Sequence, residues 1–166
     1  VIPSGDSARL MEFKKLRQNI FAHNLALHAS VMASDTRNEK GNFSAANLTD
    51  NNISTYWAAN DNVREATITL QWEKPINFNL LSLQEYIALG QRIKSFSVAA
   101  WNGKEYEEIA KGTTIGHKRI LQFPMQHTSR LQIHITESKA CPVLSEIKVY
   151  KMNNVIASSA MADEEK

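Results

Sequence analysis

The sequence of 166 residues predicts an all-β domain, a sandwich of antiparallel sheets preceded by a single α-helix. From residue 25 onward, apolar and polar side chains alternate in short segments, which is typical of strands with one buried face. Two of these segments flank Asn102-Gly103, a strong signal for a hairpin. Before residue 25 the apolar spacing is three to four residues, the period of a helix. These observations predict the fold class and the order of its elements.

A helix is predicted over residues 4–21. Its apolar side chains recur every three or four positions and so fall along one stripe. The stripe consists of Leu10, Phe13, Leu16, Ile20 and Phe21. Pro3 lies just before the helix, and Asn24 is placed to stop it. The stripe is wider than one edge of a sandwich needs, so we expect part of it to face a second partner.

Strands are predicted where the alternation with a period of two is clearest. Four of them are residues 66–72, 81–84, 131–136 and 146–150. Two more flank Asn102-Gly103, which predicts a two-residue type I′ turn because that turn requires positive φ at both central residues. Pro75 and Pro124 are expected at strand ends, since proline cannot donate a hydrogen bond to a sheet. Short strands of this kind indicate sheets packed face to face.

Composition and charge exclude several classes of function. The 19 basic and 17 acidic residues give a net charge of only +2, so neither nucleic acid nor an anionic membrane is expected as a partner. No apolar run approaches the length that crosses a bilayer, and no signal peptide is recognisable at Val1. Cys141 is the only cysteine, which excludes an intramolecular disulfide. We expect its thiol to be buried as a small hydrophobe rather than to act as a nucleophile.

Residues 90–120 are the most distinctive stretch of the chain: GQRIKSFSVAAWNGKEYEEIAKGTTIGHKRI. Its opening GQRI and closing GTTIGHKRI resemble the C-terminal module attached to many bacterial and plant alpha-L-fucosidases. That module is a discoidin-like (coagulation factor V/VIII type C) jelly-roll β-sandwich of the galactose-binding-like type. The resemblance covers nearly the whole chain except its last dozen or so residues. It implies a periplasmic or extracellular location.

The resemblance also implies a division of the chain. Residues 1–24 would be a helix connecting the sandwich to an absent catalytic barrel, residues 25–151 the sandwich, and residues 152–166 a flexible tail. The predicted function is a non-catalytic accessory module of an alpha-L-fucosidase. Its partners would be the catalytic barrel, reached through the helix, and, as an open question, a fucosylated glycan. The alternative is a free-standing carbohydrate-binding module of the family 32 type.

Residues 47–57, NLTDNNISTYW, are rich in oxygen ligands. Calcium takes six to eight hard oxygen ligands in loose geometry, and a tight loop can supply carbonyl and side-chain oxygens. The resemblance implies a structural calcium here. Its ligands would be the carbonyls of Asn47, Asn52, Thr55 and Ser145, the hydroxyl of Thr55, and the carboxylates of Asp50 and Glu146. The alternative is a loop built from Asx-turns, in which Asp50 and Thr55 bond only to the backbone. Trp57 is expected in the core rather than as a platform for a sugar.

The predicted sandwich is similar to family 32 carbohydrate-binding modules, which bind galactose-type sugars. Those modules commonly carry a His directly after the Trp, a second Trp three residues later, and an Arg in the loop before the Gly-x-x-Ile corner. Here Trp57 is followed by Ala58-Ala59-Asn60-Asp61, and the loop before Gly90 has no Arg. The usual constellation for galactose is therefore missing, and we expect galactose to bind weakly.

The polar residues that remain for a sugar site are Tyr86, Arg92 and His117. The alternative is that Arg92 and Arg119 are strand-end residues that pair with Glu85 or face solvent. An enzyme is not predicted, because a glycosidase needs two carboxylates flanking the scissile bond. Adjacent strand residues such as Glu107 and Glu108 point to opposite faces and cannot supply them. The five histidines also lack the spacing of a zinc site.

Overall fold

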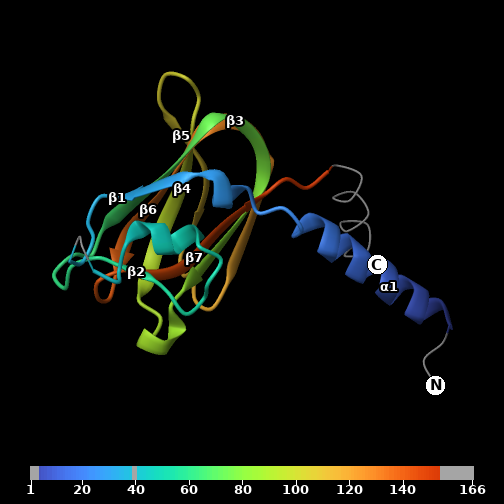
Figure 1. Ribbon diagram of the computed structural model, residues 1–166, viewed down its shortest axis with the longest axis horizontal. Helices are drawn as coiled ribbons and strands as arrows, with labels where there is room; N and C mark the ends of the chain where they lie inside the picture. Colours follow the sequence, from blue (N-terminus) through green and yellow to red (C-terminus); the bar gives the residue numbers. More distant parts are fainter. Residues whose placement is uncertain (1–3, 39–40, 154–166) are drawn as a thin grey trace.

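The computed structural model describes residues 4–38 and 41–153 (Figure 1). Their elements, in chain order, are α1 (Ser4–Ile20), η1 (Leu25–His28), β1 (Ser30–Ala33), η2 (Ala45–Thr49), β2 (Trp57–Ala58), β3 (Ala66–Glu85), η3 (Ile87–Leu89), β4 (Ile93–Trp101), β5 (Tyr106–Gly112), β6 (Arg119–Ser138) and β7 (Val143–Tyr150). The predicted class, all-β with one N-terminal α-helix, is confirmed. Among the helices described, none has the length and apolar character needed to cross a bilayer.

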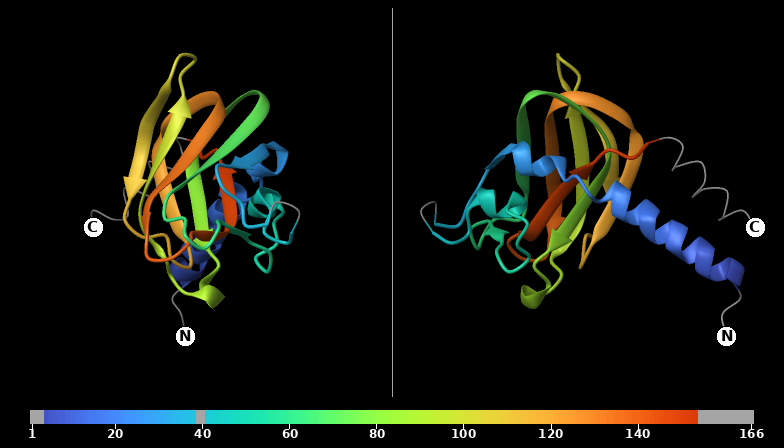
Figure 2. Two further views of the ribbon diagram at one scale, coloured as in Figure 1. Left: turned by 90° about the vertical axis from the view of Figure 1, so that its left-hand side faces the viewer. Right: turned by 45° about the vertical axis from the view of Figure 1, so that its right-hand side comes forward.

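The strands form one connected antiparallel sheet that folds over on itself. Its order is β2-β7-β3-β6-β4-β5, with β1 beside β3. β3 and β6 are 20 residues each and pair with each other along most of their length. Both bend midway, so that their two halves lie in opposite layers (Figure 2). One layer contains β1, β4 and β5 and the other contains β2 and β7, and the long strands run through both.

The prolines mark the bends in the long strands and not their ends. Pro75 lies inside β3 and Pro124 inside β6, so the prediction that they end strands is wrong. The register between β3 and β6 shifts between Gln71 and Ile76, and again beside Pro124. At a bulge the ladder is already interrupted, so a residue without an N–H group costs no sheet hydrogen bond there.

The core lies between the two layers and contains the apolar side chains of the alternating segments. Its largest members are Trp57, Phe78, Phe96, Leu48, Ile68, Leu70, Leu81, Leu83, Ile93, Leu131, Ile133 and Ile135, each less than 2% exposed. Burying one such side chain stabilises the fold by roughly 1.5–3 kcal/mol. β7 differs from the other strands, because it is buried on both faces except at Lys148. η1 and η2 pack against β7, so its polar side chains, including Glu146, are withdrawn from water.

The hairpin of β4 and β5 lies where the sequence predicts it, but its turn is different. The last strand pair is Trp101 with Tyr106, so the connecting loop has four residues and not two. Only Gly103 has positive φ, at 101°. The side-chain Oδ1 of Asn102 accepts hydrogen bonds from the N–H groups of Lys104 and Glu105. An Asx-type turn therefore replaces the predicted type I′ turn, because the short amide side chain closes the loop.

Helix α1 projects away from the sandwich (Figures 1 and 2). Leu10 and Phe13 of the predicted stripe are 59% and 56% exposed. Just after the helix ends, the ring of Phe21 meets that of Tyr150 edge to face at 5.0 Å. The helix therefore forms as predicted, and of its stripe Leu10 and Phe13 are exposed, whereas Leu16, Ile20 and Phe21 are half-buried.

Asparagine side chains hold both ends of the sandwich. At its start, Asn24 Oδ1 accepts hydrogen bonds from the N–H groups of Ala26 and Val149. At its end, the buried side chain of Asn79 both donates to the carbonyl and accepts from the N–H of Met152. Of the predicted flexible tail, residues 154–166 lie outside the described residues.

Candidate functional site

The loop predicted to bind calcium runs from η2 to β2 and is closed by its own side chains. Asp50 Oδ1 accepts a hydrogen bond from the N–H of Asn52 at 2.9 Å, and Asp50 Oδ2 accepts one from the hydroxyl of Thr55 at 2.6 Å. The Thr55 hydroxyl also lies 2.8 Å from the carbonyl oxygen of Asn52. Asn51 between them has a positive φ of 59°. Three of the predicted ligand residues are thus drawn together, through the Asx-turn contacts of the alternative interpretation.

Glu146 on β7 is the group whose position depends on the fold. Its side chain is 0% exposed, and neither carboxylate oxygen has a hydrogen-bond partner. Burial raises the pKa of Glu146 to about 7, since water no longer stabilises its charge. Lys148 opposes this shift, whereas the nearby carboxylate of Asp50 adds to it. The strand has therefore brought a second carboxylate to the loop of Asp50.

The residues present fit a calcium ion. An ionised carboxylate buried without hydrogen bonds is costly, and a bound cation is a usual way of compensating it. Asp50, Thr55, Asn52 and Glu146 supply oxygen donors of the hard type that calcium prefers. Within the described residues, no group of three or more His, Cys, Asp or Glu side chains is placed to hold a metal. This loop would hold one with two carboxylates and neutral oxygens.

The remaining predicted ligands are Asn47, at the start of the loop, and Ser145, next to Glu146 on β7. The Asn47 amide donates hydrogen bonds to the carbonyls of Asn42 and Tyr56, which hold the start of the loop. Ser145 precedes Glu146 on β7, opposite a register irregularity between Gln84 and Glu85. Both residues were predicted to act through their carbonyl oxygens.

The three residues proposed for a sugar differ in the contacts that they already make within the protein. The ring of Tyr86 is stacked on that of Tyr56 at 4.3 Å. The guanidinium of Arg92 donates to the carbonyls of Leu89 and Cys141. His117 is exposed. Two of the three thus make contacts within the protein, which favours the structural interpretation of Arg92.

Glu85 links these three positions, and the sequence interpretation missed its role. Its side chain is 3% exposed. Oε1 accepts hydrogen bonds from the N–H groups of Arg92 and Ile93, and Oε2 accepts one from Gly116. The predicted pairing of Glu85 with Arg92 therefore exists, but through the backbone and not the guanidinium. The signal for it was the alternation of Leu81, Leu83 and residue 85, which places Glu85 on a buried face.

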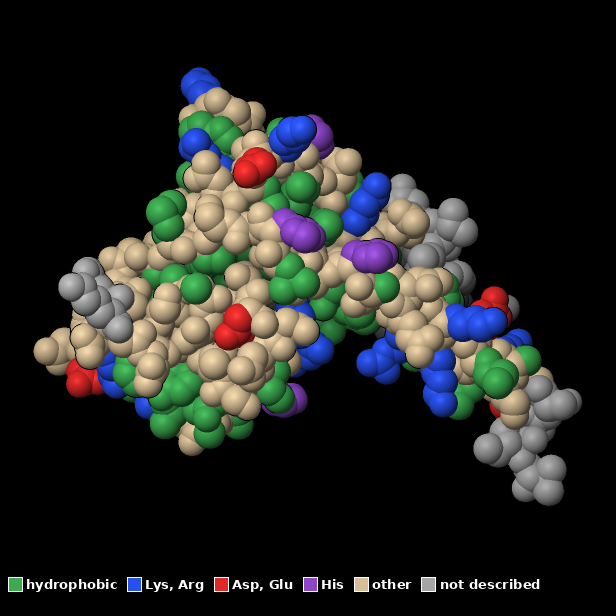
Figure 3. All heavy atoms as spheres, viewed as in Figure 1, with side chains coloured by type: hydrophobic (Ala, Val, Ile, Leu, Met, Phe, Trp, Pro, Cys, Tyr) green, Lys and Arg blue, Asp and Glu red, His purple; other side chains and the backbone are tan. Residues whose placement is uncertain are grey.

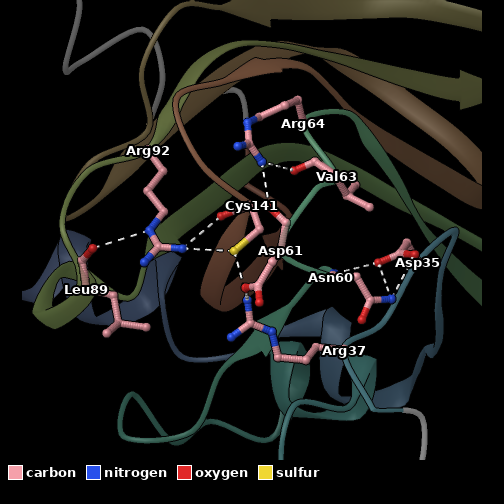
Figure 4. Close-up of polar contacts among 9 residues, drawn as sticks. All are labelled: Asp35, Arg37, Asn60, Asp61, Val63, Arg64, Leu89, Arg92 and Cys141. Carbon is pink, nitrogen blue, oxygen red and sulfur yellow. Dashed lines mark hydrogen bonds and ion pairs between the residues drawn. The ribbon is translucent and has the colours of Figure 1, made fainter.

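Two further expectations are confirmed. Trp57 is fully buried in the core, and its indole N–H donates to the carbonyl of Asp35. Cys141 is buried, with 4% exposure. Its sulfur also lies 3.1 Å from Arg37 Nη2 and 3.0 Å from Arg92 Nη1 (Figure 4). No pattern in the sequence pointed to this contact with two arginines.

Comparison with known proteins gives a family match and longer relatives. The F5/8 type C domain matches residues 30–147. "Alpha-L-fucosidase 1" of Arabidopsis thaliana is 32% identical over 90% of this chain, which corresponds to 30% of that protein. A structure described as that of an alpha-L-fucosidase from Bacteroides thetaiotaomicron is 31% identical, with a TM-score of 0.87, over 93% of this chain and 34% of the other. The chain thus spans about a third or less of the length of these relatives.

A second structural match is to a small protein that is covered almost completely. Chitosan-binding module 1 from a chitosanase/glucanase of Paenibacillus sp. IK-5 is 22% identical, with a TM-score of 0.68. The match covers 77% of this chain and 98% of that module, so it supports the fold alone. The family match spans β1 to most of β7, the same strands that carry both buried carboxylates. The chain therefore belongs to the F5/8 type C domain family, and it is a module that matches one part of longer alpha-L-fucosidases.

Proposed function

We propose that this chain is the non-catalytic accessory module of an alpha-L-fucosidase. One observation carries the proposal: nine tenths of the chain matches about three tenths of the length of its plant relatives. The remaining seven tenths of those relatives would hold the catalytic machinery. The role of this chain would be to stabilise and position that domain.

The chemistry of the described residues supports a non-catalytic role. Asp50 and Glu146 are two carboxylates close together, one with a pKa raised to about 7, which resembles a catalytic pair. Glu146 is nevertheless fully buried, so a glycosidic oxygen cannot reach it. Glu107 and Glu108 are exposed but neighbours on β5, where successive side chains point to opposite faces. Neither pair can flank a scissile bond.

Helix α1 would form part of the contact with the catalytic domain. Its residues Leu10 and Phe13 are exposed and three positions apart, on one face of the helix, and apolar and basic side chains are interspersed on this part of the surface (Figure 3). Exposed apolar clusters of this kind commonly mark an interface. The fucosidase structure matches 93% of this chain, or about 154 residues, so part of the helix has a counterpart there.

A structural calcium ion is the second part of the proposal. Asp50 and Glu146 would hold it with their carboxylates, Thr55 with its hydroxyl and carbonyl, and Asn47, Asn52 and Ser145 with their carbonyls. The ion would give the buried carboxylate oxygens of Glu146 a direct partner, which they lack among the described residues. These residues would then join the loop after η2 to strand β7 and so stabilise the outer face of that layer.

The competing function is a free-standing carbohydrate-binding module. It would use Tyr86, Arg92 and His117. However, the ring of Tyr86 is already stacked on Tyr56, and the guanidinium of Arg92 already donates hydrogen bonds within the protein, so few groups are free to bind a neutral sugar. The two functions differ in what the coding sequence upstream of Val1 encodes.

The proposed function is tested on the native protein that contains this chain, by its coding sequence and by an assay of fucoside hydrolysis. We expect its coding sequence to encode a catalytic domain before Val1, and the purified native protein to hydrolyse a chromogenic alpha-L-fucoside. The chain alone should not hydrolyse it. A native protein without such a domain, or activity that follows the isolated chain through purification, would contradict the proposal.

The role of α1 is tested by one substitution in two settings. Phe13→Asp should leave the unfolding midpoint of the isolated chain almost unchanged, because the side chain is exposed there. In the full-length protein it should lower that midpoint, because the ring would be covered by the catalytic domain. Gln18→Asp is the matched control, since it introduces the same charge on another face of α1. Equal effects of the two substitutions in the full-length protein would remove the helix from the interface.

A further inference from the structure

Four loops at one end of the sandwich bring three arginines together (Figure 4). Arg37 lies in the loop after β1, Arg64 after β2 and Arg92 after η3. The loop between β6 and β7 supplies Cys141, which contacts two of them. We refer to Arg37, Arg64 and Arg92 as the arginine cluster.

The arginines of the cluster are close enough to repel one another. Arg37 Nη2 and Arg92 Nη1 both contact the sulfur of Cys141, at 3.1 and 3.0 Å, so these nitrogens are at most 6.1 Å apart. The guanidinium of Arg64 donates to the carbonyl of Asp61, whose carboxylate pairs with Arg37. At such separations, partly buried like charges disfavour each other unless an anion lies between them.

The protein supplies too few anions for this cluster. Within the described residues, Asp61 is the one carboxylate that forms an ion pair with any of the three arginines. Glu85 lies nearby, but its oxygens accept hydrogen bonds from the backbone N–H groups of residues 92, 93 and 116. The guanidiniums of Arg64 and Arg92 bond only to carbonyl oxygens and the thiol, which are neutral. Among the described residues, one carboxylate therefore forms an ion pair with the three guanidiniums, while the charge of Glu85 is directed to backbone N–H groups instead of to them.

We propose that the arginine cluster binds an oxyanion, a carboxylate or sulfate group carried by an acidic glycan. Guanidinium groups bind such anions through paired, charge-assisted hydrogen bonds in a fixed plane. The pairing of Asp61 with Arg37 shows that a carboxylate fits beside the cluster. The anionic character of the ligand follows from the cluster itself, whereas its glycan nature rests on the proposed function.

This ligand class differs from galactose in how it gains affinity. A neutral sugar needs hydrogen-bonding side chains at the loop positions that here carry Ala58 and the run Ile87–Leu89. A charged sugar needs fewer of them, because the ion pair supplies both attraction and orientation. Neighbouring Lys139, whose N–H bonds to the carbonyl of Arg92, adds positive charge to the same end of the sandwich.

The first experiment compares four probes by calorimetry on this chain. They are D-glucuronate, galactose 6-sulfate, neutral galactose and inorganic sulfate, in about 20 mM and about 500 mM NaCl. We expect the charged sugars to bind at low salt, more tightly than galactose, and to weaken about tenfold or more at high salt. Glucuronate and galactose 6-sulfate separate a carboxylate from a sulfate ligand. Equal binding of charged and neutral sugars, or no binding of any probe, would overturn the proposal. Binding of inorganic sulfate alone would overturn its glycan part.

The second experiment changes the charges of the cluster in both directions. Arg64→Gln should weaken binding of the charged sugar about tenfold, the loss expected for one charge-assisted hydrogen bond. Asp61→Asn should tighten it severalfold, because it removes the competing carboxylate. Arg17→Gln on exposed α1 makes the same charge change as Arg64→Gln at a distant place and should have no effect. Arg64 is exposed, so its variant is expected to fold, and circular dichroism verifies this. Equal affinities for the Arg64 and Arg17 variants, or a weaker Asp61→Asn variant, would contradict the assignment.

Discussion

Two buried carboxylates, Glu85 and Glu146, are stabilised in opposite ways. Glu85 is 3% exposed and accepts three hydrogen bonds from backbone N–H groups. Glu146 is 0% exposed, and neither of its oxygens has a hydrogen-bond partner. The two lie close together in the fold, since Gln84, which precedes Glu85, pairs with Glu146 across β3 and β7. The hydrogen-bonding capacity of Glu85 is thus met by protein atoms, whereas that of Glu146 is not.

The difference shows what each carboxylate does for the loops around it. Glu85 joins the loop before β4 to the loop before β6 using protein atoms alone. Glu146 faces a loop of oxygen donors, and we propose that a cation bound there balances its charge. The first should act as a permanent structural link, and the second as a link that depends on calcium. Four predictions test this difference, beginning with the largest expected effect and ending with the smallest.

The largest effect is expected at Glu85. Glu85→Ala would leave the buried N–H group of Ile93 and the half-buried N–H group of Gly116 without acceptors, which should lower the free energy of unfolding by about 3–5 kcal/mol. Urea denaturation measures this loss, and it should be the same with calcium or a chelator. Glu85→Gln should lose less, because the amide keeps one acceptor oxygen. A loss below about 1 kcal/mol for Glu85→Ala would show that water replaces the carboxylate.

The next effect concerns Glu146 and should change sign with calcium. A hundredfold excess of calcium over its dissociation constant should stabilise the native chain by about 2.7 kcal/mol. Glu146→Gln and Asp50→Ala should each abolish this gain in thermal melts. In chelator, Glu146→Gln should be neutral or stabilising, since it removes an unpaired buried charge. Melting temperatures that ignore both calcium and chelator would refute the predicted site.

A third prediction separates the two carboxylates by pH in the presence of a chelator. The pKa of Glu146 is raised from 4.5 to about 7 in the folded chain, mainly by burial. Between these values the folded state holds a proton that the unfolded state has released. The free energy of unfolding should therefore fall as pH rises from 4.5 to 7, by up to about 3 kcal/mol. Urea titrations at pH 5, 6, 7 and 8 test this, and Glu146→Gln should flatten the dependence. A native chain as stable at pH 8 as at pH 5 would count against the raised pKa.

The smallest effect is expected for the binding of galactose to the loops before β4 and β6, which Glu85 joins. Tyr86 and Arg92 make contacts within the protein there, so a neutral sugar finds few free groups. Calorimetry should give a dissociation constant weaker than about 1 mM, or about 4 kcal/mol of binding. Tighter binding would show that these loops rearrange around a sugar.

Much of this architecture could be predicted from the pattern of residues. The alternation in residues 66–72 and 131–136 identified buried faces correctly, because a strand with one wet face must alternate. The alternation in residues 146–150 misled, since Glu146 and Tyr150 are also buried. Covering of that face by η1 and η2 is a tertiary effect that no local pattern records. The sequence also predicted that β3 and β6 end near Pro75 and Pro124, whereas both strands continue past them. In sequence, a proline at a bulge cannot be distinguished from a proline at a strand end.

The candidate sites also differ in how much of each could be predicted from the sequence. Asp50, Asn52 and Thr55 lie close in sequence, so their convergence in one loop followed from short-range spacing. The contribution of Glu146, about a hundred residues away, was expected only by resemblance. The arginine cluster had no signal, because its members come from separate loops and meet through Cys141 and Asp61 only in the fold. Long-range meetings of this kind depend on register and loop paths, which composition does not specify.

The asparagine at the start of the sandwich has a consequence for how such modules are joined in longer chains. Asn24 is bonded to Val149, and Met152 lies three residues further along, so the points where the chain reaches and leaves the sandwich are close together. Neighbouring ends allow a folded unit to be inserted into a surface loop of another protein, or deleted from it, with little displacement of the flanking chain. Gene rearrangement could therefore move this sandwich between hosts as a single piece, and a circular permutation joining residues 24 and 152 by a short linker should still fold.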